Sequence, residues 1–297
     1  MTRARLAITL GDPRGIGAEV TAKALASAEV RAVCEPVVVG PTGLAVPPDV
    51  AIGAWHAGDS EADAGKLSGL AIVRAVELAQ AGTVQGIVTA PIDKHALLAG
   101  GYDYPGHTEL LAVLTGSETA MMLASDALRV VLATTHIALR DVPDAVTAEV
   151  IGRVTAITRA GLREQLGIAN PRIALCALNP HAGDGGRFGR EDEQILAPAA
   201  RAFGLVGPLP ADTVFVRALR GEFDAVIAPY HDVGMTAIKV ASFGSAVNIT
   251  LGLPFPRTSP DHGTALDIAG KGVANEGSMI AAILACARMV TATASRT

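Results

Sequence analysis

Short apolar runs rich in β-branched residues recur along the chain, and they constrain its fold more than any other feature. They are LAITL at 6–10, GIVTA at 86–90, VVLA at 130–133, IALCAL at 173–178 and AVIAP at 225–229. Runs of this length and composition are typical of buried strands. Between them lie stretches with helical spacing, at 67–81, 148–166 and 191–203. This alternation of strand and helix predicts an α/β fold with a parallel sheet.

Length, charge and cysteine content narrow the class of protein. The chain has 297 residues, 50% of them hydrophobic, so it can bury a large core, and its length predicts about two domains. The formal net charge of -5, without any long basic block, argues against a nucleic-acid partner. The 3 cysteines are widely separated and match neither a zinc-finger spacing nor a disulfide framework. We expect them to be reduced core residues.

Neither end of the sequence predicts secretion or a membrane span. The apolar stretch at 6–10 is too short for a signal peptide. The most apolar segment, 279–290, contains Arg288 and is shorter than the roughly 20 residues that cross a bilayer. We therefore expect a buried helix there and a cytoplasmic protein that does not bind a membrane.

Three histidines follow three of the predicted strands at equivalent positions. His136 follows VVLATT, His181 follows IALCALNP and His231 follows AVIAPY. Ligands of open α/β sheets bind outside the carboxyl ends of the strands, so these histidines can converge on one site. Three imidazoles suit zinc and similar divalent metals and leave coordination positions open for substrate. The alternative is that each is an ordinary hydrogen-bonded or solvated loop histidine.

Two irregular segments indicate anion binding. GDPRGIGAE at 11–19 is a glycine-rich turn whose N–H groups can approach an anion or simply allow tight packing, and it is not the G-x-G-x-x-G of a Rossmann site. The segment 239–275 interleaves Lys239, Asn248 and Arg257 with Gly and Pro. These residue types together suit a phosphate. The alternative is that Lys239 and Arg257 are solvated surface charges.

Long, irregular motifs spread along most of the chain match a known family in the same order. They are GDPRGIGAE, VTAPIDKHALLAGGYDYPGHTE, TTHIALRDV, LNPHAGDGGRFGREDE, PLPADTVF, PYHDVGMTAIKV and FPRTSPDHGTALDIAGKG. With these motifs the chain resembles the 4-hydroxythreonine-4-phosphate dehydrogenase family of vitamin B6 biosynthesis. It departs from the family's common pattern at Asp93, where PINK is usual, and at Ala18, where GPE is usual.

The resemblance implies two α/β domains of the isocitrate/isopropylmalate dehydrogenase type, with the active site in the interdomain cleft at a dimer interface. On this basis we expect a cofactor-side domain at 1–100, completed by 270–297. A second domain at 101–269 would carry the metal, substrate and dimer contacts. The family forms homodimers in which both subunits contribute metal ligands to each site, so an isolated monomer would be inactive.

Carried over residue by residue, the resemblance implies roles for the candidates. The metal ligands fall on the three strand-end histidines, His136, His181 and His231. Substrate contacts fall on His107 and Thr108, and phosphate contacts on Lys239, Asn248 and Arg257. The segment 261–275 is similar to the adenine-binding loop of decarboxylating dehydrogenases, which makes His262, Gly263, Thr264, Ala265, Asp267 and Asn275 cofactor candidates. Asp212 and Asp232 are candidates for orienting a histidine or moving a proton.

The reaction implied is oxidation of 4-phosphohydroxy-L-threonine by NAD or NADP, with one zinc, cobalt, magnesium or manganese ion in each site. The resulting 2-amino-3-oxo-4-phosphooxybutanoate then loses carbon dioxide to give 3-amino-2-oxopropyl phosphate. Relatives with nearly the same motifs oxidise D-threonate or D-erythronate 4-phosphate, and this alternative stays open. A metal-dependent hydrolase or lyase is disfavoured by the adenine-loop resemblance, and a non-catalytic binding protein by the presence of all the metal and phosphate candidates.

Overall fold

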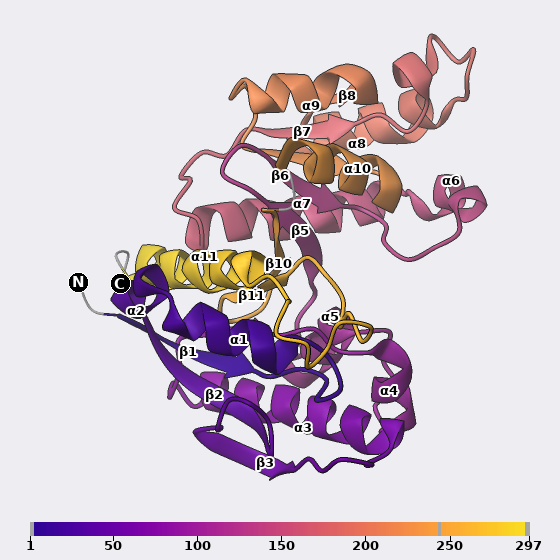
Figure 1. The fold of residues 1–297 in the computed structure, drawn as a ribbon. Coiled ribbons are helices and arrows are strands. Elements are labelled where there is room, and N and C mark those ends of the chain that lie inside the picture. The colour runs from indigo at the N-terminus through magenta and orange to yellow at the C-terminus, as the bar shows by residue number, and fades with distance from the viewer. Residues whose placement is uncertain (1–2, 243–244, 295–297) are drawn as a thin grey trace. The chain divides into compact units, whose positions relative to one another are not determined.

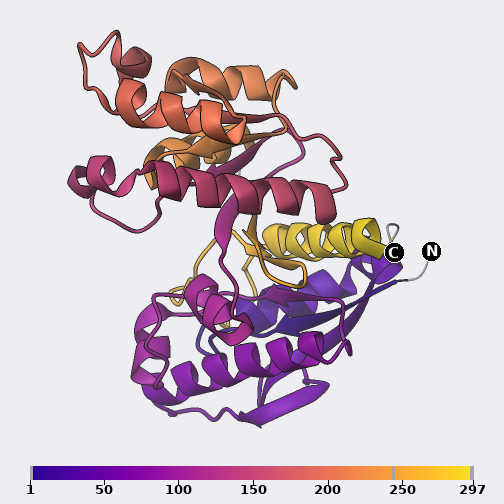
Figure 2. The ribbon, with the colours of Figure 1, turned by 180° about the vertical axis from the view of Figure 1, so that it is seen from behind.

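The protein is described by a computed structural model that covers residues 3–242 and 245–294. The chain forms two compact units (Figure 1, Figure 2). Unit 1 comprises residues 1–118 and 247–297, and unit 2 comprises residues 119–246. Each unit has its own sheet segment and its own hydrophobic core.

The described sheet of unit 1 has the strand order β3–β2–β1–β4–β11–β10. The bounds are β1 Ala4–Thr9, β2 Cys34–Thr42, β3 Val50–Ala54, β4 Gly86–Thr89, β10 Val247–Leu251 and β11 Arg257–Pro260. Strand β10 runs antiparallel to β11, and the other neighbours are parallel. The carboxyl ends of β1, β4 and β11 therefore meet at one edge, which is where ligands of such sheets bind.

Helices cover both faces of this sheet (Figure 1). They are α1 Gly17–Ala26, α2 Ala28–Val33, α3 Glu61–Gln80, α4 Lys94–Ala99, α5 His107–Thr115 and α11 Gly277–Ala294. Side chains of β2 alternate between the two layers, since Val37 and Val39 pack with α3 while Val38 packs towards α1. Helix α3 begins with a capping box in which Ser60 and Asp63 bond each other's backbone N–H.

The described sheet of unit 2 has the strand order β5–β6–β9–β7–β8. The bounds are β5 Ala120–Ala124, β6 Arg129–Leu132, β7 Ile173–Cys176, β8 Val206–Leu209 and β9 Ala225–Ala228. Only β5 is antiparallel to its partner in this unit. The helices are α6 Val142–Ala145, α7 Ala148–Glu164, α8 Ala197–Phe203, α9 Ala211–Leu219 and α10 His231–Ser242. Short 3-10 turns lie at Leu139–Asp141 and Pro180–Gly183, and a π-helix at Asp192–Leu196.

The predicted α/β class is confirmed, but the unit boundaries differ from the expected domains. Each apolar run singled out in the sequence forms a strand, as β1, β4, β6, β7 and β9. Residues 101–118 and 247–269, expected in the second domain, lie in unit 1. The physical reason is that α5 packs its Leu110 and Leu111 into the core beneath α3, while β11 pairs with β4.

The apolar C-terminal segment forms α11, which buries Met279, Ile283, Cys286 and Met289. It packs against β4 and β11, as expected of a core helix. Among the described residues, α11 is also the one helix long and apolar enough to cross a membrane, a test that core helices of soluble proteins pass as well. All 3 cysteines are free and buried, as the sequence predicts.

Candidate functional site

Two of the strand-end histidines of unit 2 lie side by side. His136 follows β6 and His231 begins α10 directly after β9, and these two strands are parallel neighbours. Their ring centroids are 5.7 Å apart, with the ring planes tilted by 44°. Two imidazoles bound at about 2.1 Å to one tetrahedral ion would have centroids roughly 5 Å apart. The pair therefore fits a shared divalent metal by both donor type and spacing.

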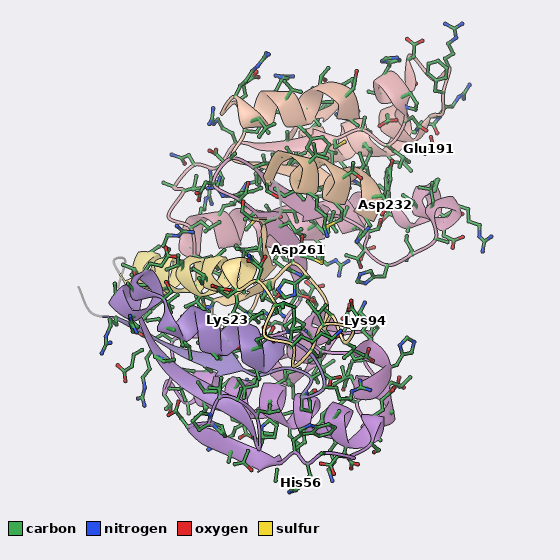
Figure 3. The ribbon with its side chains drawn as sticks, viewed as in Figure 1. Lys23, His56, Lys94, Glu191, Asp232 and Asp261 are labelled. Atoms are coloured by element: carbon green, nitrogen blue, oxygen red, sulfur yellow. The ribbon has the colours of Figure 1, made fainter. Side chains whose placement is uncertain are left out.

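Asp232 orients one ring of this pair. Its Oδ1 lies 2.6 Å from Nδ1 of His231. A neutral imidazole that donates from Nδ1 has its Nε2 lone pair free for a metal, and a carboxylate at this position is the usual partner of a metal-bound histidine. Asp232 is labelled in Figure 3 at the start of α10. Asp212, the other acidic candidate, is exposed in the first turn of α9.

The third histidine does not join the pair within one chain. Among residues 3–242 and 245–294, no three His, Cys, Asp or Glu side chains are grouped so that they could hold a metal ion. His181 is exposed, and its nearest ring neighbour is Phe188, at 6.5 Å between centroids. The convergence of all three histidines, expected from their strand-end positions, therefore does not occur inside a single chain. The cause is local, because His181 lies on a long loop with its own turn, beyond the end of β7.

Unit 1 contains a buried guanidinium that no carboxylate in the described part of the chain pairs with directly, although the negative charge of Glu109 acts on it. Arg257, at the start of β11, is 1% exposed and donates from Nη1 to Thr250 Oγ1 at 2.8 Å and from Nη2 to Thr89 Oγ1. Its Nε has no hydrogen-bond partner, and no ion pair within the described part of the chain involves it. Burial lowers the pKa of Arg257 to about 10. The alternative that Arg257 is a solvated surface charge is wrong.

Two more buried polar atoms near Arg257 also lack partners. They are Nε2 of His107, in the first turn of α5, and Oδ1 of Asn248 on β10. Asn248 lies two residues before Thr250, so it shares the sheet face from which Thr250 meets Arg257. Burial, followed by the positive charges of Arg257 and Lys94, lowers the pKa of His107 well below its usual value. Because buried polar groups are nearly always hydrogen-bonded, these atoms are open to a partner outside the protein chain, either water or a polar ligand.

The remaining substrate candidates are placed differently. Thr108 follows His107 in α5 and is half-buried. Lys239 is exposed on α10 of unit 2, so the predicted phosphate residues are divided between the two units. Lys94, labelled in Figure 3 at the start of α4, was not among the predicted site residues, yet its charge acts on His107. It lies in the family motif at 88–109, which was the sequence signal that could have identified it.

The candidate cofactor loop, 261–275, packs on the glycine-rich turn after β1. Ile16 N–H donates to Thr264 O at 3.0 Å, and a Cβ at Gly15 would lie 2.9 Å from the same oxygen. Near its end the loop is held by α1, where Glu19 accepts from Ala274 N–H at 2.8 Å and Lys23 donates to Ala274 O at 2.7 Å. The glycine-rich turn therefore serves close packing between loops.

The cofactor candidates are spread along this loop. They are partly or fully accessible: His262, Gly263, Thr264, Ala265, Asp267 and Asn275. His262 Nε2 is buried without a partner, although part of the residue is accessible, while Asn275 Oδ1 accepts from Gly277 N–H at 2.8 Å at the start of α11. Asp93 lies near the same edge of the sheet and caps α4 by accepting from Ala96 N–H at 2.8 Å. Arg14, 3.8 Å away, offsets the added charge of Asp93.

Comparison with known proteins gives a consistent set of relatives. The family model described as "Pyridoxal phosphate biosynthetic protein PdxA" matches residues 7–286. The 4-hydroxythreonine-4-phosphate dehydrogenase of Geobacter metallireducens is 44% identical over 97% of this chain and 96% of its own. A putative D-threonate 4-phosphate dehydrogenase of Bradyrhizobium diazoefficiens is also 44% identical, over 95% of this chain and 96% of its own.

Solved structures show the same relationship. The crystal structure of 4-hydroxythreonine-4-phosphate dehydrogenase from Klebsiella pneumoniae has a TM-score of 0.85 and 39% identity, covering 97% of this chain and 98% of that one. Isocitrate dehydrogenase from Methylococcus capsulatus, at 16% identity and a TM-score of 0.53, covers 98% of this chain and 88% of its own, and shares the fold. The expected isocitrate dehydrogenase-like fold type is confirmed.

Proposed function

The chain belongs to the family of the pyridoxal phosphate biosynthetic protein PdxA and is a dehydrogenase, and from this premise we propose its substrate, cofactor and metal. The substrate is 4-phosphohydroxy-L-threonine, oxidised at its secondary alcohol with NAD or NADP as the acceptor. The product, 2-amino-3-oxo-4-phosphooxybutanoate, decarboxylates to 3-amino-2-oxopropyl phosphate. The enzyme acts in the cytoplasm as a homodimer.

The observation that carries this proposal is the buried Arg257, which forms no ion pair in the described part of the chain and feels the charge of Glu109 only at longer range. A buried charge that is not directly paired is unfavourable, so a ligand that supplies the opposite charge beside it is stabilised there. Arg257 Nε, and His107 Nε2 in the tautomer that carries its proton there, can each donate a hydrogen bond to an anionic oxygen. Asn248 Oδ1 accepts, so it suits a hydroxyl or ammonium group of the substrate. The substrate's phosphate and carboxylate both supply anionic oxygens.

Each of these side chains has a distinct task in binding the substrate. Arg257 is fixed by two threonine hydroxyls, so its charge is oriented before the ligand arrives. His107 stays neutral because of its lowered pKa, so it can donate or accept one hydrogen bond without adding charge. In unit 2, Asp232 holds the His231 ring in one orientation. When bound, a divalent metal supplies Lewis acidity and the nicotinamide accepts the hydride.

The metal is held by His136 and His231 of one protomer and by His181 of the partner subunit. The 5.7 Å spacing of the first pair supports a shared ion, and the exposure of His181 leaves it accessible to a second copy. Three imidazoles suit zinc or cobalt, with magnesium and manganese as alternatives. The cofactor is bound by the 261–275 loop on unit 1, where His262 Nε2 offers an unpaired polar atom.

D-threonate 4-phosphate or D-erythronate 4-phosphate is the alternative substrate. It is supported by the relatives named for D-threonate 4-phosphate, which are 44% and 43% identical over nearly all of this chain. These sugar acids differ from phosphohydroxythreonine by a hydroxyl in place of the amino group, while the phosphate and carboxylate are unchanged. The anion-binding residues of unit 1 serve both substrates equally, so the choice between them depends on other groups.

The test is reduced-nicotinamide formation by metal-loaded protein with each substrate and with each of NAD and NADP. We expect turnover with 4-phosphohydroxy-L-threonine that is lost on chelation and restored by added zinc or cobalt. Turnover on the two sugar-acid phosphates alone would replace the first substrate with the alternative. Undiminished turnover after complete chelation would contradict the metal role.

A further inference from the structure

The loop that carries His181 is held at its start by one buried carboxylate. Asp192, at the first position of the π-helix, is 1% exposed. Its Oδ1 accepts from Leu178 N–H at 2.8 Å. Its Oδ2 accepts from the N–H of Asn179 at 3.0 Å and from Nδ2 of the same residue at 2.9 Å. The two carboxylate oxygens of Asp192 thus hold the backbone N–H groups of Leu178 and Asn179, just before His181.

The backbone that Asp192 holds is unfavourable on its own. His181, Ala182 and Asp184 have φ values of 54°, 55° and 45°, and the glycines at 183, 185 and 186 are also at positive φ. Non-glycine residues in this left-handed region cost free energy and persist only where the surroundings fix them. Gly183 is buried, and a Cβ there would lie 3.7 Å from Oδ2 of Asp192. The strained turn therefore folds directly over the Asp192 carboxylate.

Two neighbours complete the arrangement. Asn179 Nδ2 also donates to Glu191 Oε2 at 2.8 Å, and Glu191 is labelled in Figure 3 beside this loop. A Cβ at Gly189 would lie only 2.7 Å from Asn179 Nδ2, so the far side of the loop closes onto the same amide. The π-helix starts at Asp192 itself, and short π-helical turns are frequent at functional sites.

We propose that Asp192, acting through Asn179, is a positioning residue that holds His181 in its metal-binding conformation. The proposal rests on the metal role proposed above for His181. Asp192 does not touch the metal, because three N–H donors already occupy its oxygens inside the protein. Its effect is on the conformation from which His181 meets the ion, as other buried carboxylates orient metal-bound histidines.

The experiment measures binding of Co²⁺ alone to the full-length protein, by the visible absorption of the bound ion, together with hydrogen exchange of residues 178–191. We expect Asp192→Asn to weaken Co²⁺ binding about 10- to 100-fold and to speed exchange in this loop alone. An asparagine offers one acceptor oxygen and places an N–H₂ group against a backbone N–H. Asp192→Glu, which keeps the carboxylate, is expected to restore part of the affinity.

Asp184→Asn is the matched control, because Asp184 lies on the same loop but is exposed, and its carboxylate forms an exposed ion pair with Arg187, at 3.7 Å. We expect its Co²⁺ affinity to stay within about twofold of the parent protein. His181→Ala separates the two proposals. If His181→Ala weakens Co²⁺ binding while Asp192→Asn leaves it unchanged, the positioning role is overturned and the metal site stands.

If His181→Ala itself binds Co²⁺ like the parent protein, the metal role of His181 fails and the positioning role fails with it. If Asp192→Asn does not fold, Asn179→Ala decides the matter. This variant removes one of the three donors to Asp192 and is expected to weaken Co²⁺ binding about 3- to 10-fold. Unchanged binding in a folded Asn179→Ala protein would overturn the proposal.

Discussion

In unit 1 the candidate binding atoms are buried before any ligand arrives, whereas in unit 2 they are accessible and incomplete. Arg257 is 1% exposed and fixed by two threonines, while His136 and His181 are both exposed and lie in separate groups. The buried Arg257 can be paired by an anion that binds within the same chain. The exposed histidines can instead be joined by a histidine of a second copy of the chain. The anion-binding group of unit 1 is therefore preformed, and the histidine pair of unit 2 is not.

The largest effect is expected from Arg257→Met, which removes the buried charge of unit 1. We expect kcat/KM for the phosphorylated substrate to fall roughly a thousandfold, because the fixed charge opposite the anion is lost. The unliganded protein should unfold at the same or a higher temperature, since replacing a buried unpaired cation with an apolar side chain is often neutral or stabilising. Inorganic phosphate should raise the melting temperature of the parent protein and not that of the variant. A large loss of unliganded stability would show that Arg257 is structural.

A smaller effect is expected from the accessible histidine pair of unit 2, His136 and His231. Asp232→Ala should weaken Co²⁺ binding about tenfold, since the His231 ring loses the carboxylate that orients it. The unfolding temperature without metal should change little, because the Asp232 side chain is 87% exposed. Titration with Co²⁺ measures the first quantity and thermal unfolding the second. Equal Co²⁺ affinity in the variant would remove Asp232 from the site.

The comparison also predicts a pH dependence that belongs to unit 1. The pKa of His107 is lowered by burial and by nearby positive charge. Below the unfolded-state pKa of about 6.5, His107 is therefore protonated in the unfolded chain but stays neutral in the folded one. The free energy of unfolding should fall as the pH drops from about 7 towards 5. In His107→Gln this slope should be shallower, as measured by urea unfolding at each pH. An unchanged slope would place the titrating group elsewhere.

The smallest effect is expected at Asp93, the departure from the family's usual asparagine. Asp93→Asn should change the free energy of unfolding by less than about 0.5 kcal/mol, because asparagine caps a helix about as well as aspartate. Because the variant should be as stable as the parent protein, any change in its KM for the nicotinamide cofactor would measure the influence of the Asp93 charge on cofactor binding. A stability loss much above this value would mean that the Arg14–Asp93 contact contributes more than an exposed ion pair does.

Much of the fold and half of the site could be predicted from the sequence. The apolar runs were strong enough to identify β1, β4, β6, β7 and β9, and the position of each histidine after its strand was correct. The separation of His181 from the pair could not be predicted, because it depends on the left-handed turn that Asp192 holds. Neither the hydrophobic periodicity nor the residue composition of a sequence predicts which distant carboxylate will hold such a turn.

The burial of Arg257 could not be predicted from the sequence either. Its burial follows from the pairing of β10 with β11 and of β11 with β4, which brings Thr250 and Thr89 to its guanidinium. Strand register between segments this far apart is a tertiary property. For the same reason the unit boundary was misplaced around 247–269, where the pairing of β11 with β4 decides to which unit the strands belong.

The role of the buried group around Arg257 is best tested by comparing a phosphorylated substrate with its unphosphorylated counterpart. The measurement is kcat/KM of the metal-loaded protein for 4-phosphohydroxy-L-threonine and for 4-hydroxy-L-threonine, in the parent protein and in Arg257→Met. If this group binds the phosphate, the parent protein should prefer the phosphorylated compound by roughly a hundredfold or more, and the variant should largely lose this preference. Equal turnover of the two compounds by the parent protein would rule out phosphate binding at Arg257.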